Sequence, residues 1–151
     1  MNYREAIDAD LQIIKELFDI NKLPSDDCED HIKHFLVIEE KGKIIGVGGL
    51  EICGTIGLVR SMAVIPELRG KGIAKSLYTL LEYRAHGLGI KTLYLLTESA
   101  TEYFKNLGFI VQEHSEVPVS VMETRQFKEL CPSSATVMFR EISDRQRQQN
   151  P

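Results

Sequence analysis

Cysteine, tryptophan and excess basic charge are all scarce in this sequence. Its 151 residues include no tryptophan and three scattered cysteines, Cys28, Cys53 and Cys131. An odd number of cysteines, without Cys-x-x-Cys or metal-ligand spacing, argues against a disulfide framework and against a bound metal. Lysine and arginine total 18 against 22 acidic residues, the net charge is −4, and no predicted helix carries a basic stripe. We therefore expect neither a nucleic acid nor an anionic membrane as a partner.

Long hydrophobic runs are missing as well. No apolar stretch approaches the roughly 18 residues that suggest a transmembrane helix, and residues 1–5 do not resemble a signal peptide. Together with the cysteine pattern, this predicts a cytoplasmic protein with reduced thiols. With 43% hydrophobic and 26% charged residues, the chain is typical of a globular protein. We expect one domain over residues 1–142 and a disordered, polar tail over residues 143–151.

The pattern of apolar residues predicts a mixed α/β fold. Period-two runs and buried runs predict strands at 3–6, 35–39, 44–52, 56–65, 92–96, 109–113 and 136–141. Helical spacing predicts a first helix capped by Asp8 or Asp10, a second from residue 25 or 26 to 34, and two more at 75–86 and 99–106. Gly108 is expected to end the last helix in a left-handed conformation. Residues 118–134 show too little regular pattern to predict.

A glycine-rich turn joins the predicted strand at 56–65 to the helix at 75–86. It consists of Arg69, Gly70, Lys71, Gly72, Ile73 and Ala74. Backbone N–H groups at the start of a helix have no intrahelical partner, and the helix dipole is positive there. This arrangement predicts a site for a phosphate or a pyrophosphate, although an ordinary strand-to-helix turn would have the same local pattern.

The spacing of this turn argues against two nucleotide-binding fingerprints. A dinucleotide site has glycine at the first, third and sixth positions, but Lys75 occupies the sixth. The Gly-Lys-Ser/Thr ending of a mononucleotide P-loop is also missing. The turn instead resembles the acetyl-CoA loop of the GNAT family of N-acetyltransferases, which reads Gln or Arg, two residues, Gly, one residue, then Gly or Ala. Arg69, Gly72 and Ala74 fill these places.

The resemblance to this family extends over nearly the whole chain. It implies a single domain with a mixed, mostly antiparallel central sheet flanked by helices, and an acetyl-CoA-dependent enzyme that uses no metal. A narrower resemblance is to the arsenic-resistance N-acetyltransferases, some of which acetylate amino-acid-like organoarsenicals and whose catalytic domain is similar to that of N-acetylglutamate synthase. It rests on Gly-Leu-Glu at 49–51, Leu-Val-Arg-Ser at 58–61, Tyr-Leu-Leu-Thr at 94–97 and Gln-Phe-Lys-Glu-Leu-Cys-Pro at 126–132. Members of the family are often dimers, which implies a homodimer here.

The resemblance also implies which residues hold the cofactor. The pantetheine arm would lie beside the backbone of Met62, Ala63 and Val64, as an added strand does, while their side chains pack in the core. The pyrophosphate would take N–H groups from residues 69–74. Thr97 occupies the place of an asparagine that lies near pantetheine in many relatives, and its hydroxyl offers a smaller hydrogen-bonding group.

The position of the usual general acid differs from the family pattern. Relatives often carry a tyrosine four residues before the glycine of a Gly-Phe turn, and here that position holds Phe104. Tyr103 lies one residue earlier, about 100° round the helix, so a packing or surface role competes with a catalytic one. A thiol with a pKa of about 8.5 can also leave as a thiolate without an acid.

Glu51 and Arg60 are charged residues in otherwise apolar strands. Because side chains alternate along a strand, either register of a hairpin with a two-residue turn places both on the same face. One interpretation is a structural ion pair. The other is functional: Arg60 binds a substrate carboxylate or similar anion, and Glu51 accepts the proton of the reacting amine.

Three further residues are weaker candidates for binding the acceptor. His31, three residues before His34, would lie near the acceptor groove, or be merely packed or solvated. Arg125 would be a second anion anchor. Cys131 would suit an arsenical through its soft sulfur, although a lone cysteine is more often a packed residue. Two other functions stay open: an enzyme that acetylates a protein N-terminus or lysine, and a non-catalytic module that senses acyl-CoA.

Overall fold

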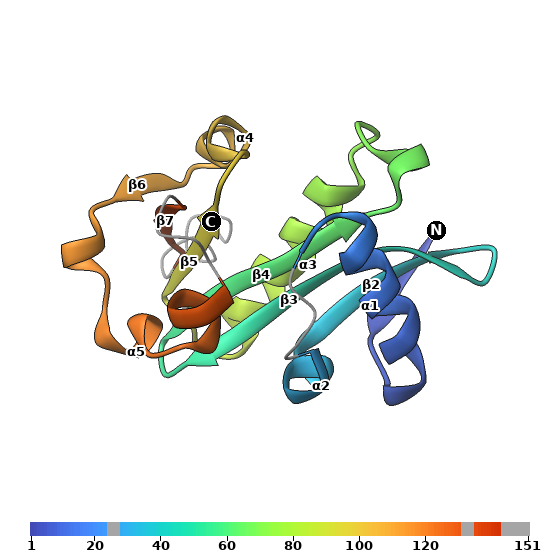
Figure 1. Cartoon of the computed structure of the whole chain (residues 1–151), viewed down its shortest axis with the longest axis horizontal. Helices are drawn as coiled ribbons and strands as arrows, with labels where there is room; N and C mark the ends of the chain where they lie inside the picture. The colour runs from blue at the N-terminus through green and yellow to red at the C-terminus, as the bar shows by residue number, and fades with distance from the viewer. Residues whose placement is uncertain (24–27, 131–134, 143–151) are drawn as a thin grey trace, which may run out of the picture. The chain divides into compact units, whose positions relative to one another are not determined.

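The computed structural model describes residues 1–23, 28–130 and 135–142 (Figure 1). The chain divides into two compact units. The first comprises Met1–Glu51 with Val59–Arg84, and the second comprises Ile52–Leu58 with Ala85–Pro151. The domain boundary and the disordered tail predicted after residue 142 fall outside the described residues and stay predictions.

A seven-stranded mixed sheet has the order β1-β2-β3-β4-β5-β7-β6. The antiparallel pairs include β1 with β2, β2 with β3, β5 with β7 and β6 with β7, whereas β4 and β5 are parallel. This confirms the predicted mixed, mostly antiparallel sheet. The strands are β1 (Asn2–Glu5), β2 (Phe35–Glu40), β3 (Lys43–Cys53), β4 (Ile56–Val64), β5 (Thr92–Thr97), β6 (Ile110–Gln112) and β7 (Thr136–Glu141).

In the first unit, helices cover both faces of the strands. Figure 1 shows α1 (Leu11–Ile20) and α2 (Cys28–His31) on one face and α3 (Ile73–Gly87) on the other. Val37 of β2 belongs to the core cluster under α1 and α2, and its neighbour Ile38 belongs to the cluster under α3. Because successive side chains of a strand point to opposite faces, β2 contributes side chains to both cores.

One close contact fixes the position of β3 within this unit. Phe35 of β2 lies opposite Gly49 of β3, and its ring packs edge-to-face on Phe18 at 5.9 Å between centroids. A Cβ on Gly49 would come within 2.2 Å of the Phe35 ring and 3.4 Å of the Arg60 carbonyl oxygen. Glycine is therefore required at position 49, two residues before Glu51.

The start of α1 differs from the prediction. A 3₁₀ turn at Asp8–Asp10 precedes the helix, and the Asp10 side chain makes no capping bond to it. Its carboxylate instead accepts two hydrogen bonds from the Arg4 guanidinium, at 2.8 and 2.9 Å, and one from the Ile7 N–H at 2.8 Å. Asp10 thus occupies the N-cap position, one of the two predicted, but its side-chain capping bond is absent because a guanidinium from β1 competes successfully for the carboxylate.

The second predicted helix ends as an α-helix three residues earlier than expected. The described part comprises α2, which ends at His31, and a 3₁₀ turn at Ile32–His34. The expected start at residue 25 or 26 falls outside the described residues.

The second unit packs around β5, which pairs with Ile56, Gly57 and Leu58 of β4 and with β7. It also contains α4 (Thr101–Asn106), α5 (Val119–Met122) and a π-helix at Gln126–Leu130. Val117 and Val121 join Leu58, Tyr94 and Val137 in one core cluster. Residues 118–130, which the sequence left without a prediction, are thus largely helical, and Val121 joins them to the core.

Gly108 has the predicted positive φ, +99°.

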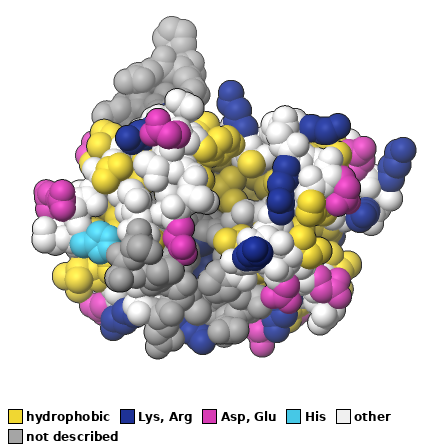
Figure 2. All heavy atoms as spheres, turned by 45° about the horizontal axis from the view of Figure 1, so that its top comes forward, with side chains coloured by type: hydrophobic (Ala, Val, Ile, Leu, Met, Phe, Trp, Pro, Cys, Tyr) yellow, Lys and Arg dark blue, Asp and Glu magenta, His cyan; other side chains and the backbone are white. Residues whose placement is uncertain are grey.

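Charged side chains of both signs are interspersed over the face drawn in Figure 2.

Candidate active site

The turn between β4 and α3 presents backbone donors. Gly70 and Gly72 have φ values of +79° and +84°, a region that side chains other than glycine rarely adopt. The N–H of Ser76 donates to the Gly72 carbonyl at 3.1 Å, within the first turn of α3. The N–H groups of Ile73 and Ala74 therefore precede the hydrogen-bond ladder of the helix and point outward from its positive end. This geometry fits a phosphate group.

Arg69 is held at the entrance of this turn. Its guanidinium donates to the Asn21 side-chain oxygen at 2.7 Å. The Asn21 amide in turn donates to the carbonyls of Leu17 at 2.9 Å and Val64 at 3.3 Å. The Arg69 N–H donates to the Pro66 carbonyl at 3.3 Å, so the donors that remain for a phosphate begin at Gly70. Arg69 thus anchors the turn to the end of α1.

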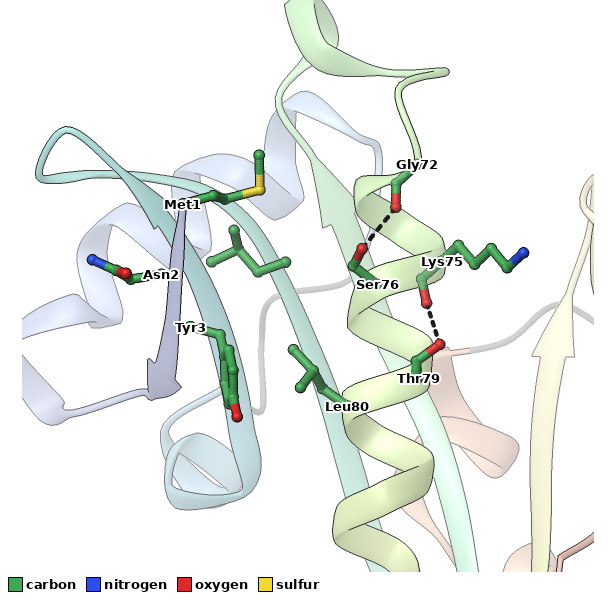
Figure 3. A pocket seen from close by; sticks show the side chains of 9 residues that line it. Met1, Asn2, Tyr3, Gly72, Lys75, Ser76, Thr79 and Leu80 are labelled. Carbon is green, nitrogen blue, oxygen red and sulfur yellow. Dashed lines mark hydrogen bonds between the residues drawn. The ribbon is translucent and has the colours of Figure 1, made fainter. Parts of the chain in front are cut away.

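A pocket of about 460 Å³ lies on the β1 side of α3 (Figure 3). The hydroxyls of Ser76 and Thr79 donate to carbonyls of their own helix, at 3.1 and 2.9 Å, and the Lys75 side chain points away from the pocket. Its other walls include aromatic and aliphatic side chains, so it suits an apolar group better than a phosphate. The lining residues are Met1, Asn2, Tyr3, Ile38, Gly72, Lys75, Ser76, Thr79 and Leu80.

The strand before the turn contains a backbone irregularity. Ser61 has a φ of +58°, which is rare for a residue with a side chain. Its hydroxyl accepts a hydrogen bond from Nε of Arg60 at 3.2 Å. Ala63 and Val64, which follow, are buried in core clusters, as expected for their side chains, while Met62 is half-buried. The cofactor role of their backbone stays a prediction.

Three candidate residues meet in the first unit. Nη1 of Arg60 lies 3.3 Å from Oε1 of Glu51, which confirms that the two residues share a face. The same oxygen lies 3.8 Å from Nε2 of His31. The side chains are 1% exposed for Arg60, 16% for Glu51 and 22% for His31. The exposed fraction thus rises from the guanidinium of Arg60 through the carboxylate of Glu51 to the imidazole of His31.

The other candidates lie in the second unit. The Thr97 hydroxyl accepts the N–H of Ala100 at 2.9 Å and so supports the start of α4. Tyr103 is 40% exposed, its ring packs on Phe104 at 5.3 Å, and partial burial raises the pKa of its phenol. Arg125 is exposed between α5 and the π-helix. Cys131 falls outside the described residues.

Two residues of this region were missed by sequence reasoning. Asn21 follows α1 directly, and asparagine is a known C-terminal residue of helices, so its position was a usable signal. The unusual φ of Ser61 has no local sequence signal, because serine has no preference for that conformation.

Within the part of the chain that the structure describes, no group of histidine, cysteine and acidic residues is placed to bind a metal ion. In the same residues, no helix is both long and apolar enough to cross a membrane.

Comparison with curated proteins finds relatives named amino-acid acetyltransferase. The Pseudomonas aeruginosa protein (strain PAO1) is 33% identical over 94 residues, which are 61% of this chain and 22% of that protein. The protein from Neisseria meningitidis serogroup B is 30% identical over 103 residues, 65% of this chain and 22% of that protein. The chain therefore spans about a fifth of the length of these relatives.

Solved structures share the fold. Rv2747 from Mycobacterium tuberculosis, solved in complex with CoA and NLQ, has a TM-score of 0.80 at 23% identity, covering 94% of this chain and 99% of that one. N-acetylglutamate synthase from Neisseria gonorrhoeae, solved with coenzyme A and L-arginine, has a TM-score of 0.80 at 25% identity, covering 93% and 33%. The model of the Acetyltransferase (GNAT) family matches residues 5–109. Since this match covers more than half of the sequence, the chain belongs to the GNAT acetyltransferase family.

Proposed function

We propose that this protein transfers an acetyl group from acetyl-CoA directly to the amino group of a small, amino-acid-like acceptor. One observation carries the proposal: a chain of the GNAT family presents outward backbone N–H groups in the turn between β4 and α3. Relatives named amino-acid acetyltransferase and neighbours solved with CoA support it, although this chain covers only part of those relatives.

The turn and the strand before it would hold the cofactor. The N–H groups of residues 70–74 bind the pyrophosphate, and the positive φ of Gly70 and Gly72 orients the turn for this contact. The backbone of residues 62–64 pairs with the pantetheine arm, and Thr97 is a further candidate that the family resemblance alone supports. Acetyl-CoA supplies an activated acyl group, and the protein's task is to position it and remove a proton.

Glu51 would accept the proton of the acceptor ammonium, directly or through water. The free amine then attacks the thioester carbonyl, so that a C–N bond forms, the C–S bond breaks, and the second proton of the nitrogen passes to water or to the departing thiolate. A backbone N–H of residues 62–64 stabilises the oxyanion. Tyr103 is the candidate donor to the departing sulfur, and a solvent proton is the alternative, because a thiol with a pKa of about 8.5 is a good leaving group.

Arg60 would bind the acceptor through a carboxylate or similar anion. Its guanidinium is almost fully buried and contacts Glu51, so an anion and an amine bound here would lie on either side of that contact. Arg125 is the candidate for a second anion contact. Acetylation of an organoarsenical is the narrower form of this proposal, and the sequence resemblance alone supports it.

A thiol-release screen tests the proposal. The purified protein and acetyl-CoA are mixed with amino acids, their phosphinate and arsinate analogues, and short peptides, and products are identified by mass spectrometry. Release of the CoA thiol with an amino acid or one of its analogues supports the proposal. Faster release with arsinate analogues than with amino acids supports the narrower form, acetylation of an organoarsenical. Release with peptides alone indicates a protein acetyltransferase. Tight CoA binding by calorimetry without turnover on any amine indicates a sensing module.

Two further expectations follow from the sequence. The family resemblance implies a homodimer, which light scattering at several protein concentrations would measure. A cytoplasmic location would be checked by cell fractionation with an antibody against the protein.

A further inference from the structure

His31 is held in place by contacts that do not involve Glu51. It is the last residue of α2, whose first residue, Cys28, is fully buried in the core with Ile14 and Phe18. Lys15 of α1 pairs with Glu29 of α2 at 2.9 Å. These two contacts fix the short helix against α1, and they leave the His31 imidazole 3.8 Å from Oε1 of Glu51.

Glu51 contacts two groups that a proton on its carboxylate would affect. Its Oε1 faces both Arg60 and His31, so protonation of the carboxylate would remove the negative charge that the buried guanidinium contacts. An uncompensated buried charge is strongly unfavourable. A proton taken from a substrate therefore has to move on before the next cycle, and the His31 imidazole, which is slightly more exposed than Glu51, faces this oxygen.

We propose that His31 carries the amine proton from Glu51 to solvent. This inference rests on the proposed acetyl transfer. The acceptor ammonium gives one proton to Oε1 of Glu51, Glu51 gives it to Nε2 of the neutral imidazole, and the imidazolium releases it to water. No electrons are exchanged, and Glu51 and His31 return to their starting states. The 3.8 Å separation exceeds a direct hydrogen bond, so the transfer proceeds through a small side-chain movement or a bridging water.

His34 provides a matched control on the same segment. It lies three residues after His31, in the 3₁₀ turn that continues α2. Burial lowers the pKa of its imidazole, and the charges of Arg84, Lys33 and His31 lower it further, with Glu5 opposing them. His34 is part of the same segment, but it has no assigned place in the proton path.

The experiment compares His31→Ala, His31→Gln and His34→Gln in the full chain, with an acceptor found in the screen. We expect kcat to fall about 10²-fold in both His31 variants, at the low end of general acid–base effects, with both KM values unchanged. Added imidazole restores kcat of His31→Ala in proportion to its concentration, and His34→Gln keeps the wild-type rate. Thermal melting checks that each variant is folded.

Three outcomes would overturn the relay: an unchanged kcat in a folded His31→Gln variant, a loss that imidazole does not restore, or a loss that appears as a raised acceptor KM. The last result would make His31 a binding residue. Wild-type protein that acetylates no acceptor overturns the proposed function itself, which distinguishes that failure from failure of the relay alone.

Discussion

Two arginine-centred ion clusters in the first unit differ in their geometry. Arg4 binds both oxygens of Asp10, at 2.8 and 2.9 Å, and Oε1 of Glu39 at 2.7 Å. Arg60 lies 3.3 Å from one oxygen of Glu51, which also faces His31 at 3.8 Å. The side chain of Arg4 is 36% exposed, whereas that of Arg60 is 1% exposed. The tighter cluster is thus built on the more exposed arginine.

This difference separates a structural role from a functional one. Short, bidentate contacts around Arg4 join β1 to the start of α1 and to β2, which suits a cluster that stabilises the fold. Burying Arg60 and Glu51 costs hydration that offsets much of their attraction, so the pair adds little net stability, although removing one partner alone is destabilising. Looser contacts suit a site whose charges exchange partners during a reaction. Changes at the Arg4 cluster should therefore alter stability, and changes at the Arg60 cluster should alter acetyl transfer.

The largest expected effect is that of Glu51→Gln on the rate. Glutamine keeps the shape but cannot accept a proton, so kcat should fall by about 10²–10⁴-fold. CoA affinity, measured by calorimetry, should stay close to wild type, whereas the melting temperature should fall, because glutamine removes the negative charge beside the buried Arg60 guanidinium. A variant with normal kcat would remove Glu51 from the chemistry and leave the Arg60 cluster with a structural role.

Arg60→Lys tests the anion contact while keeping the positive charge. Lysine cannot make a bidentate contact, and a lost hydrogen bond to a charged group is worth about 1.5–3 kcal/mol. The KM for the acceptor should therefore rise about ten- to hundredfold at an unchanged CoA dissociation constant. Arg4→Lys is the matched control, and the comparison between the clusters fails if it raises the acceptor KM equally.

Asp10→Asn should lower the free energy of unfolding by about 1–3 kcal/mol, because it weakens charged hydrogen bonds of a buried carboxylate. Chemical denaturation measures this loss, and kcat should stay at the wild-type value. A lower kcat at full stability would show that the Arg4 cluster is more than structural.

The difference in stability between wild type and Asp10→Asn should depend on pH. The hydrogen bonds from Arg4 hold the pKa of Asp10 below its ordinary range. A group whose pKa is lowered by folding stabilises the protein above its unfolded pKa of about 3.9 and loses that contribution as the pH falls through the folded value. The difference in unfolding free energy between wild type and Asp10→Asn should therefore be full at neutral pH and shrink in acid.

Gly72→Ala extends the comparison to a region without an ion pair. The left-handed conformation at Gly72 would cost alanine about 1–2 kcal/mol. If the turn relaxes to avoid this cost, CoA should bind more weakly, and calorimetry should show a loss of binding free energy of up to this size. Gly87→Ala is the control, because Gly87 lies in α3 without a positive φ and with open space around its Cα. Equal CoA affinity in both variants would argue against the turn as the phosphate site.

Local patterns predicted much of this fold and part of the site. The order of strands and helices followed from periodicity, and the meeting of Glu51 with Arg60 followed from strand parity, which does not depend on the register of the turn. Contacts between distant segments were not predictable in the same way. The Arg4 guanidinium binds the Asp10 carboxylate in place of the expected capping bond, and the Thr97 hydroxyl accepts the N–H of Ala100. The position of α5 depends on packing of Val117 and Val121 in the core.

Asn21 gives the turn before α3 a further property. Through Arg69, the Asn21 side chain fixes the entrance of the turn to the ends of α1 and β4, and at the exit Ile73, the first residue of α3, is buried in the core. Only three residues, from Gly70 to Gly72, span the distance between these two anchors. The turn is thus preorganised: folding of the first unit has already met most of the entropy cost of ordering it, so a phosphate that binds there has little more to supply.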